Sequence, residues 1–273
     1  MVDFSKKKRI VIKLGTSTLA HKTGKLNIRR MNNLVRVLAD LQNSGHELIL
    51  VSSGAVGLGV GKLNLKERPK TTPGKQAAAA VGQCELMHIY DEMFSKYSVT
   101  VAQILLTKTI ISSTERVDNV RNAIDELTAM SVIPIVNEND TVAIDELELE
   151  IGENDSLSAV VASIAGAELL IILSDIDGLY SEDPHKNENA RIIPVVECID
   201  THIEEIAGGA GSSLGTGGMA TKLRAAKMTT AAGVDMIIAN GEEPGILYDI
   251  VAGKPVGTRF LSKSKHSEGA YDC

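Results

Sequence analysis

The chain has 273 residues, of which 44% are apolar and only 3% aromatic, and it carries a formal net charge of −7. Such a chain can bury a large core, while its negative field disfavours nucleic acids and anionic membranes as partners. Its three scattered cysteines predict no disulfide framework and are typical of a reducing cytoplasm. No apolar run reaches the roughly 18 residues that a membrane-spanning helix needs.

Short apolar runs alternate along the chain with stretches of helical periodicity. Strands are expected at residues 9–14, 48–51, 99–106, 132–136, 168–173 and 235–239. Helices are expected at residues 28–41, 77–97, 117–130, 156–166 and 219–232. Asn27 is the expected N-cap of the first helix, and Gly45 its C-terminal stop. Continuous apolar strands between helices predict an α/β fold, a three-layer α/β/α sandwich with a mostly parallel central sheet. One domain is expected over residues 1–261, followed by a mobile polar tail over 262–273.

Polar segments follow several of these strands, at the sheet edge where parallel sheets bind ligands. Lys13 ends a buried strand, so it is either a phosphate ligand or a side chain that reaches out to solvent. The glycine-rich segment 52–57 either offers backbone amides to an anion or forms an ordinary turn into a helix. Residues 137–140 either bind an ammonium or hydroxyl group or form a solvated loop. Asp155 either caps the next helix or holds a nearby lysine by charge pairing.

The segment Gly215-Thr-Gly-Gly-Met-Ala-Thr-Lys222 leads from glycines directly into a helix. The amides and dipole at a helix N-terminus favour an anion, whereas Lys222 in the first turn opposes that dipole and indicates a compensating phosphate. The alternative is a flexible hinge before the helix. Two lysines and amide-rich loops at one sheet edge indicate phosphoryl transfer, which depends on positioning and charge neutralisation. The sequence has no cluster with zinc-ligand spacing, and no metal-ligating residue is predicted.

Six motifs taken together resemble the amino acid kinase family. They are Val11–Ser17, Val51–Gly57, Val136–Asp140, Gly152–Ser158, Leu173–Tyr180 with Asp183-Pro184, and Gly215–Lys222. Their order and spacing are most similar to family members that phosphorylate the side-chain carboxylate of free L-glutamate. The resemblance spans residues 8–261. It implies ATP and Mg²⁺ as cofactors, L-glutamyl 5-phosphate as the product and a cytoplasmic role as the first step of proline biosynthesis. It also implies feedback inhibition by proline and a homo-oligomer, either a dimer or a tetramer.

The resemblance also implies a role for each matching residue. Lys13 and Lys222 would contact the ATP phosphates as catalytic residues, and Asp155 would orient them. The remaining ATP-binding residues would be Ser174, Asp175, Thr216, Gly217, Gly218, Met219, Ala220 and Thr221. The acceptor would be bound by Ser53, Asp140 and Asn154, with Asn137 nearby. The alternatives are a sister kinase with another carboxylate or carbamate as substrate, and a catalytically silent amino-acid sensor.

The chain departs from the family pattern at two places. Glu153 stands where the family often has Asp, which puts the fine geometry of substrate binding in question. Many members also carry a C-terminal PUA domain, whereas only about a dozen residues follow Leu261 here. Properties that depend on that domain are therefore expected to be absent. The glycine-rich segment 208–218 is the expected loop that closes over the substrate.

Overall fold

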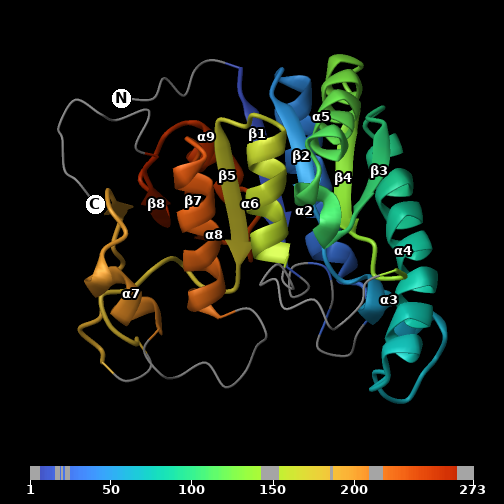
Figure 1. The fold of residues 1–273 in the computed structure, drawn as a ribbon, viewed down its shortest axis with the longest axis horizontal. Helices are drawn as coiled ribbons and strands as arrows, with labels where there is room; N and C mark the ends of the chain where they lie inside the picture. Colours follow the sequence, from blue (N-terminus) through green and yellow to red (C-terminus); the bar gives the residue numbers. More distant parts are fainter. Residues whose placement is uncertain are drawn as a thin grey trace.

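The chain is described here from a computed structural model, over residues 7–15, 19, 21, 25–142, 154–184, 187–208 and 218–262. These residues form an α/β/α sandwich around a sheet of eight strands (Figure 1). The strands are β1 Arg9–Leu14, β2 Glu47–Val51, β3 Val101–Leu106, β4 Ile133–Glu138, β5 Leu169–Ser174, β6 Val195–Val196, β7 Asp235–Asn240 and β8 Thr258–Phe260. Their order across the sheet is β3-β4-β2-β1-β5-β7-β8-β6, and only the β7–β8 pair is antiparallel. The predicted mostly parallel sheet is therefore confirmed.

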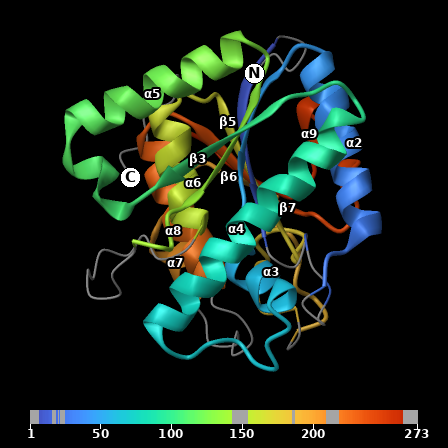
Figure 2. The same cartoon turned by 90° about the vertical axis from the view of Figure 1, so that its right-hand side faces the viewer.

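Helices cover both faces of this sheet (Figure 2). They are α2 Ile28–Asn43, α3 Ala55–Lys62, α4 Thr72–Ser95, α5 Thr114–Ala129, α6 Asn154–Ile164, α7 Thr201–Gly208, α8 Met219–Ala231 and α9 Ile246–Val251, with a 3-10 turn, η1, at Lys108–Ser112. Because side chains alternate along a strand, each central strand contributes to two apolar cores. Ile10, Ile12 and Leu14 of β1 pack with α2, α4 and α9, whereas Val11 packs with α5, α6 and α8.

Local sequence signals explain several helix ends. The Asn27 side chain accepts a hydrogen bond from the Arg30 backbone N–H at 3.1 Å, so this residue caps α2 as predicted. Gly45, with φ +100°, follows the end of α2, where a left-handed residue favours glycine. Helix α4 begins at residue 72 rather than at the expected 77, because Thr71 caps it and Pro73 lies in its first turn.

Helix α3 is the helix that one of the two interpretations of segment 52–57 expected, but its bounds could not be predicted because its sequence, AVGLGVGK, is rich in glycine. Tight packing on α4 accounts for it. A Cβ atom built on Gly59 would lie 1.8 Å from the Ala78 carbonyl oxygen, and one on Gly82 would lie 1.7 Å from the Ala55 carbonyl oxygen. Two glycines, one from each helix, therefore let the two backbones approach closely. This contact holds the start of α3 close to the end of β2, with only Ser52, Ser53 and Gly54 between them.

The folded part of the chain extends beyond residue 261. Ser262, the first residue of the predicted tail, is fully buried, and its N–H and hydroxyl both donate to Asp235 Oδ1 at 2.9 Å. Ser262 is therefore part of the core, and residues 263–273 lie outside the described residues. Cys84 is an exposed free thiol. Within the described ranges, no helix has the length and hydropathy to cross a membrane.

Candidate active site

The register of the sheet brings the polar strand ends into one line. Lys13 of β1 pairs with Val51 of β2 and with Ile172 of β5, and Val51 pairs with Val136 of β4. The residues that follow this row across the sheet are Ser52 and Ser53, Asn137 to Asp140, and Ser174 with Asp175. The carboxyl ends of four neighbouring strands therefore meet at one edge, as the sequence predicted.

A group of three charged side chains lies at this edge, and we call Lys13, Asp155 and Lys222 the charge triad. Lys13 Nζ lies 2.6 Å from Asp155 Oδ1, and Lys222 Nζ lies 3.3 Å from Asp155 Oδ2. The three side chains are only 12%, 2% and 5% exposed, respectively. Because two cations share one carboxylate, the charge triad holds a formal excess of one positive charge away from water. Two buried ammonium groups on one carboxylate can also hold an anionic ligand, so this geometry is suited to phosphates.

Asp155 lies inside the first turn of α6, which begins at Asn154, so it pairs with the lysines rather than capping the helix. Burial alone would raise its pKa. The charges of Lys13 and Lys222, with hydrogen bonds from Lys13 and Thr221, outweigh burial and hold the pKa of Asp155 below its usual value. Asp155 is therefore an ionised, orienting group at neutral pH and not a proton donor.

The start of α8 completes this part of the site. Lys222 is in the first turn of the helix, as predicted, and Thr221 Oγ1 donates to Asp155 Oδ2 at 3.1 Å and to the Gly218 carbonyl at 2.8 Å. The N-cap, Gly218, has no side chain with which to cap the first-turn amides. These amides and the helix dipole favour an anion next to the charge triad.

A second group lies on the other side of Asp155, at the ends of β2 and β4. Asn154 Nδ2 donates to the Ser52 carbonyl at 2.6 Å, to Ser53 Oγ at 2.7 Å and to Asn137 Oδ1 at 3.3 Å. We call Asn154, Asn137 and Ser53 the amide cluster. Since Asn154 and Asp155 are consecutive, the first turn of α6 joins the amide cluster to the charge triad.

The hydrogen bonds of the amide cluster show which side of the Asn137 amide carries the oxygen and which carries the nitrogen. The backbone N–H of Glu138 donates to Asn137 Oδ1 at 2.9 Å, so the Asn137 amide nitrogen must face the other way. It donates to Gln83 Oε1 on α4, also at 2.9 Å. Ser53 Oγ accepts from Asn154, which leaves its hydroxyl hydrogen for another acceptor, such as a carboxylate. The sequence reasoning missed Gln83, because no motif surrounds it in the middle of a long helix.

Asp140 follows the end of β4 and is half-buried. Burial raises its pKa above the usual value, and the charge of Arg68 offsets only part of this effect. In the described part of the chain, no hydrogen bond joins Asp140 to Asn154 or Ser53. The structure therefore brings three of the four predicted acceptor residues into direct contact and places the fourth, Asp140, two residues beyond the end of β4.

The predicted nucleotide residues divide into those near α8 and those at the end of β5. Met219, Ala220 and Thr221 form the first turn of α8 with Lys222. Ser174 Oγ donates to Asp175 Oδ1 at 3.1 Å, and the Gly241 N–H donates to the Ser174 carbonyl at 2.8 Å, which joins the ends of β5 and β7. Thr216, Gly217, Glu153 and most of the predicted closing loop lie outside the described residues.

The described residues offer few ligands to a metal ion. They contain no group of three or more His, Cys, Asp or Glu side chains that could hold a metal ion. Asp155, the most buried carboxylate of the site, is already shared by two lysines. This donor set fits a Mg²⁺ ion that arrives on a nucleotide, because Mg²⁺ is often held by phosphates and water with few protein ligands.

Comparison with known proteins gives a consistent assignment. Residues 8–240 match the amino acid kinase family. The glutamate 5-kinase of Clostridium perfringens is 54% identical over 258 residues, which are 94% of this chain and 96% of that protein. The glutamate 5-kinase of Enterococcus faecalis is 49% identical over 263 residues, 96% and 97% of the two chains. That of Moorella thermoacetica is 49% identical over 95% of this chain but only 68% of its own length, so some relatives are longer.

Solved structures show the same fold at low sequence identity. Carbamate kinase from Giardia lamblia bound to AMP-PNP superposes with a TM-score of 0.66 at 15% identity, covering 94% of this chain and 99% of that one. UMP kinase from Bacillus anthracis gives a TM-score of 0.61 at 16% identity, covering 93% and 96%. These likenesses concern the fold alone, whereas the family match and the relatives of about 50% identity concern the sequence as well. The chain belongs to the amino acid kinase family and, within it, to the glutamate 5-kinases.

Proposed function

We propose that this chain transfers the γ-phosphoryl group of ATP to the side-chain carboxylate of L-glutamate. The products are ADP and L-glutamyl 5-phosphate, in the first step of proline biosynthesis. The observation that supports this most is the first turn of α6, where Asn154 contacts the amide cluster and Asp155 holds two buried lysines. These contacts of one helical turn support an acceptor that is held beside the phosphates. The glutamate 5-kinases that this chain resembles support glutamate as the acceptor.

The acceptor side follows from the chemistry of glutamate. Its side-chain carboxylate has a pKa of about 4.3, so it is already ionised at neutral pH and needs no general base. One carboxylate oxygen attacks the γ-phosphorus while the bond from that phosphorus to the ADP oxygen breaks. The free hydroxyl hydrogen of Ser53 is suited to donate to a carboxylate of the substrate. Asp140 supplies the negative charge that the substrate ammonium group requires, with Asn154 and Asn137 completing the pocket.

The phosphate side must overcome the repulsion between a carboxylate and a polyanion. Lys13 and Lys222 stabilise the negative charge on the transferring group, and Asp155 fixes the positions of both ammonium groups before ATP binds. The first turn of α8, from Met219 to Lys222, directs its amides toward the phosphates, and the family resemblance adds Thr216 and Gly217 to the nucleotide-binding residues. Ser174 and Asp175 contact the nucleotide from the end of β5. Mg²⁺, when bound with ATP, neutralises phosphate charge.

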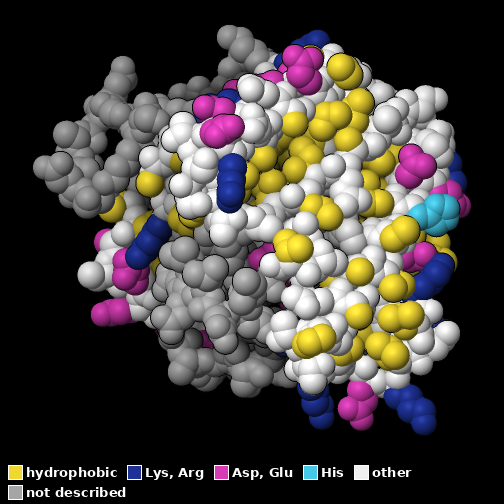
Figure 3. Space-filling model, turned by 45° about the vertical axis from the view of Figure 1, so that its right-hand side comes forward, with side chains coloured by type: hydrophobic (Ala, Val, Ile, Leu, Met, Phe, Trp, Pro, Cys, Tyr) yellow, Lys and Arg dark blue, Asp and Glu magenta, His cyan; other side chains and the backbone are white. Residues whose placement is uncertain are grey.

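Three further properties remain proposals based on the family resemblance. They are a cytoplasmic location, feedback inhibition by proline, and a homo-oligomer that is a dimer or a tetramer. For the homo-oligomer, Figure 3 shows apolar side chains over the face that carries α4 and β3. β3 is also an edge strand, with a neighbour on only one side among the described strands. An uncovered edge and an apolar surface favour self-association.

The test is ADP release from MgATP with glutamate, N-acetylglutamate, aspartate, carbamate and UMP in turn, with hydroxylamine present to trap an acyl phosphate. Glutamate-dependent ADP release together with a glutamyl hydroxamate is expected. Turnover with another acceptor alone would reject glutamate and indicate a sister kinase. Binding of glutamate without ADP release, in folded protein, would reject the kinase activity and indicate an amino-acid sensor.

A further inference from the structure

We propose that Gln83 on α4 is a positioning residue of the acceptor site, because its side-chain oxygen fixes the orientation of the Asn137 amide. This inference rests on the proposed function, since it concerns how the same site holds its acceptor. It adds a residue that lies outside all six family motifs. The nearest motif residues in the sequence are more than 20 positions away on either side.

The contact that carries the proposal is buried and links distant parts of the chain. Gln83 is 9% exposed, and its Oε1 accepts from Asn137 Nδ2 at 2.9 Å across 54 positions in the sequence. Asn137 Oδ1 in turn accepts from the Glu138 N–H and from Asn154 Nδ2. Glu138 and Asn154 both contact the Asn137 side-chain oxygen. Gln83 therefore supplies the acceptor for the other group of that amide, the nitrogen.

The other end of the Gln83 amide is unfavourable for the core. Its Nε2 is buried and finds no hydrogen-bond acceptor among the residues that the structure describes. An unsatisfied buried donor lowers stability, so an apolar side chain of similar length would suit this position better on packing alone. A buried side chain with an unsatisfied donor is expected at a functional site, where a different atom of the same side chain is needed. Here that atom is Oε1.

Loss of this oxygen would act on the acceptor side of the site. Without Gln83, Asn137 Nδ2 would become a buried donor without a partner, and the amide would turn or draw in water. The 3.3 Å contact from Asn154 to Asn137 would then change, and with it the Asn154 contact that orients Ser53. Asp155 stays anchored by its two lysines. The effect should therefore fall on glutamate and not on ATP.

The first experiment compares the wild-type chain with Gln83→Met, which has a similar length and no hydrogen-bonding group. The KM for glutamate is expected to rise at least about fivefold, because a buried hydrogen bond of the acceptor site is lost. The KM for ATP is expected to be unchanged. The melting temperature is expected to be unchanged or higher. An unchanged glutamate KM would overturn the proposal. So would a lower melting temperature with both KM values raised, or a protein that does not fold.

A double-mutant cycle tests whether Gln83 acts through Asn137. In an Asn137→Leu background, Gln83→Met is expected to cause no further rise in the glutamate KM, because the contact is already absent. Tyr90→Phe is the matched control, since Tyr90 lies on the same helix and its hydroxyl contacts Ser52 Oγ at 3.0 Å instead of Asn137. Its effect should combine independently with Asn137→Leu. Independent effects of Gln83→Met and Asn137→Leu would contradict the proposal.

Gln83→Glu provides a conservative rescue, because it keeps an oxygen that can accept from Asn137 Nδ2. Its glutamate KM is expected to lie closer to the wild-type value than that of Gln83→Met, and the reverse order would count against the proposal. The wild-type hydroxamate assay tests the proposed function separately. If the wild type turns over a different acceptor, the same comparison of KM values is made with that acceptor, so the two failures can be told apart.

Discussion

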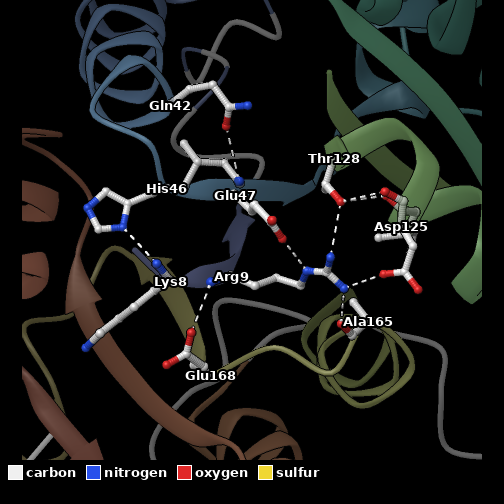
Figure 4. Close-up of polar contacts among 11 residues, drawn as sticks. Lys8, Arg9, Gln42, His46, Glu47, Asp125, Thr128, Ala165 and Glu168 are labelled. Atoms are coloured by element: carbon white, nitrogen blue, oxygen red, sulfur yellow. Dashed lines mark hydrogen bonds and ion pairs between the residues drawn. The ribbon is translucent and has the colours of Figure 1, made fainter. Parts of the chain in front are cut away.

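The two ends of β1 carry ion pairs of opposite design. Arg9, at the amino end, contacts Glu47 at 2.7 Å and Asp125 at 2.5 Å, and it also donates to the Ala165 carbonyl at 2.8 Å (Figure 4). At the carboxyl end of the same strand, Lys13 and Lys222 share the single carboxylate of Asp155. Arg9 therefore pairs with two carboxylates, whereas two lysines of the charge triad pair with one carboxylate.

Burial differs between the two ends as well. The side chains of Arg9, Glu47 and Asp125 are 22%, 44% and 45% exposed, so water moderates their interactions. Burial would lower the pKa of Arg9, but its hydrogen bonds with Glu47 and Asp125 outweigh burial and raise the pKa. The charge triad is almost completely buried. The comparison teaches that ion pairs alone do not distinguish the two ends of β1. The burial of two lysines around one carboxylate does, and it lies at the end where we propose that phosphates bind.

The largest expected effect is that of Lys222→Ala. Removing this ammonium group should lower kcat by about 100- to 1000-fold, because it stabilises charge in the transition state, with a smaller effect on the glutamate KM. Steady-state kinetics with both substrates measures this. The matched control is Lys227→Ala on the same helix, an exposed lysine that pairs with Glu204, and its kcat should be unchanged. A near-normal kcat in Lys222→Ala would remove the functional meaning of the charge triad.

Asp155→Asn should lower kcat by about 10- to 100-fold, because the two lysines lose the anion that orients them. The protein without nucleotide should also lose about 3 kcal/mol of stability. MgATP should restore part of this loss, since its phosphates replace the missing negative charge, so the thermal shift on adding MgATP should exceed that of the wild type. An equal shift in both proteins would contradict a site poised for phosphates.

The stability difference between wild type and Asp155→Asn should also depend on pH. The folded pKa of Asp155 lies below the usual value of 3.8, so its contribution is fully present above that value. It is lost only as pH falls through the lower, folded pKa. Denaturant unfolding from neutral to acid pH should therefore show a constant difference down to about pH 5 and a shrinking one below. A difference that already falls near neutral pH would show that Asp155 is not held ionised.

Gly59→Ala is expected to act at the acceptor side. The new Cβ would lie 1.8 Å from the Ala78 carbonyl oxygen, so α3 must move, and Ser53 immediately precedes its N-cap, Gly54. The glutamate KM should rise about tenfold and the unfolding free energy should fall by about 1–3 kcal/mol. Gly57→Ala on the same helix is the control, because no atom lies within 4 Å of its Cβ. It should stabilise the protein slightly. Similar behaviour of the two variants would contradict the close packing of α3 on α4.

The sequence predicted those parts of the fold and site that have a local signal. Lys13 and Lys222 were found because a lysine at a strand end, or after glycines at a helix start, is unusual in itself. Gln83 was missed because its partner, Asn137, is 54 positions away. The Arg9 network was missed for the same reason, since Glu47 and Asp125 lie 38 and 116 positions away. Contacts of this kind depend on the finished packing and leave no pattern in a single sequence.

The boundaries of helices and strands were also predicted only where the sequence carries a local signal. Long, strongly periodic segments such as α2 were predicted within two residues. The six-residue helix α9 and the three-residue strand β8 were missed, because segments this short carry little periodicity. The antiparallel pairing of β8 with β7 could not be predicted without β8. Helix α3 required knowledge of the surface against which its glycines pack.

The smallest expected effect is that of Arg9→Met, which tests the comparison from its other end. The variant loses its contacts with Glu47 and Asp125 and should lower the unfolding free energy by about 1–2 kcal/mol, since the network is partly exposed. Added salt should reduce this difference, because exposed ion pairs are screened. The kcat and both KM values should stay unchanged, because Arg9 lies at the opposite end of β1 from Lys13 and contacts no residue of the charge triad or the amide cluster. Reduced kcat in folded Arg9→Met would show that the two ends of the strand are coupled, and that the charge triad depends on more than its own three residues.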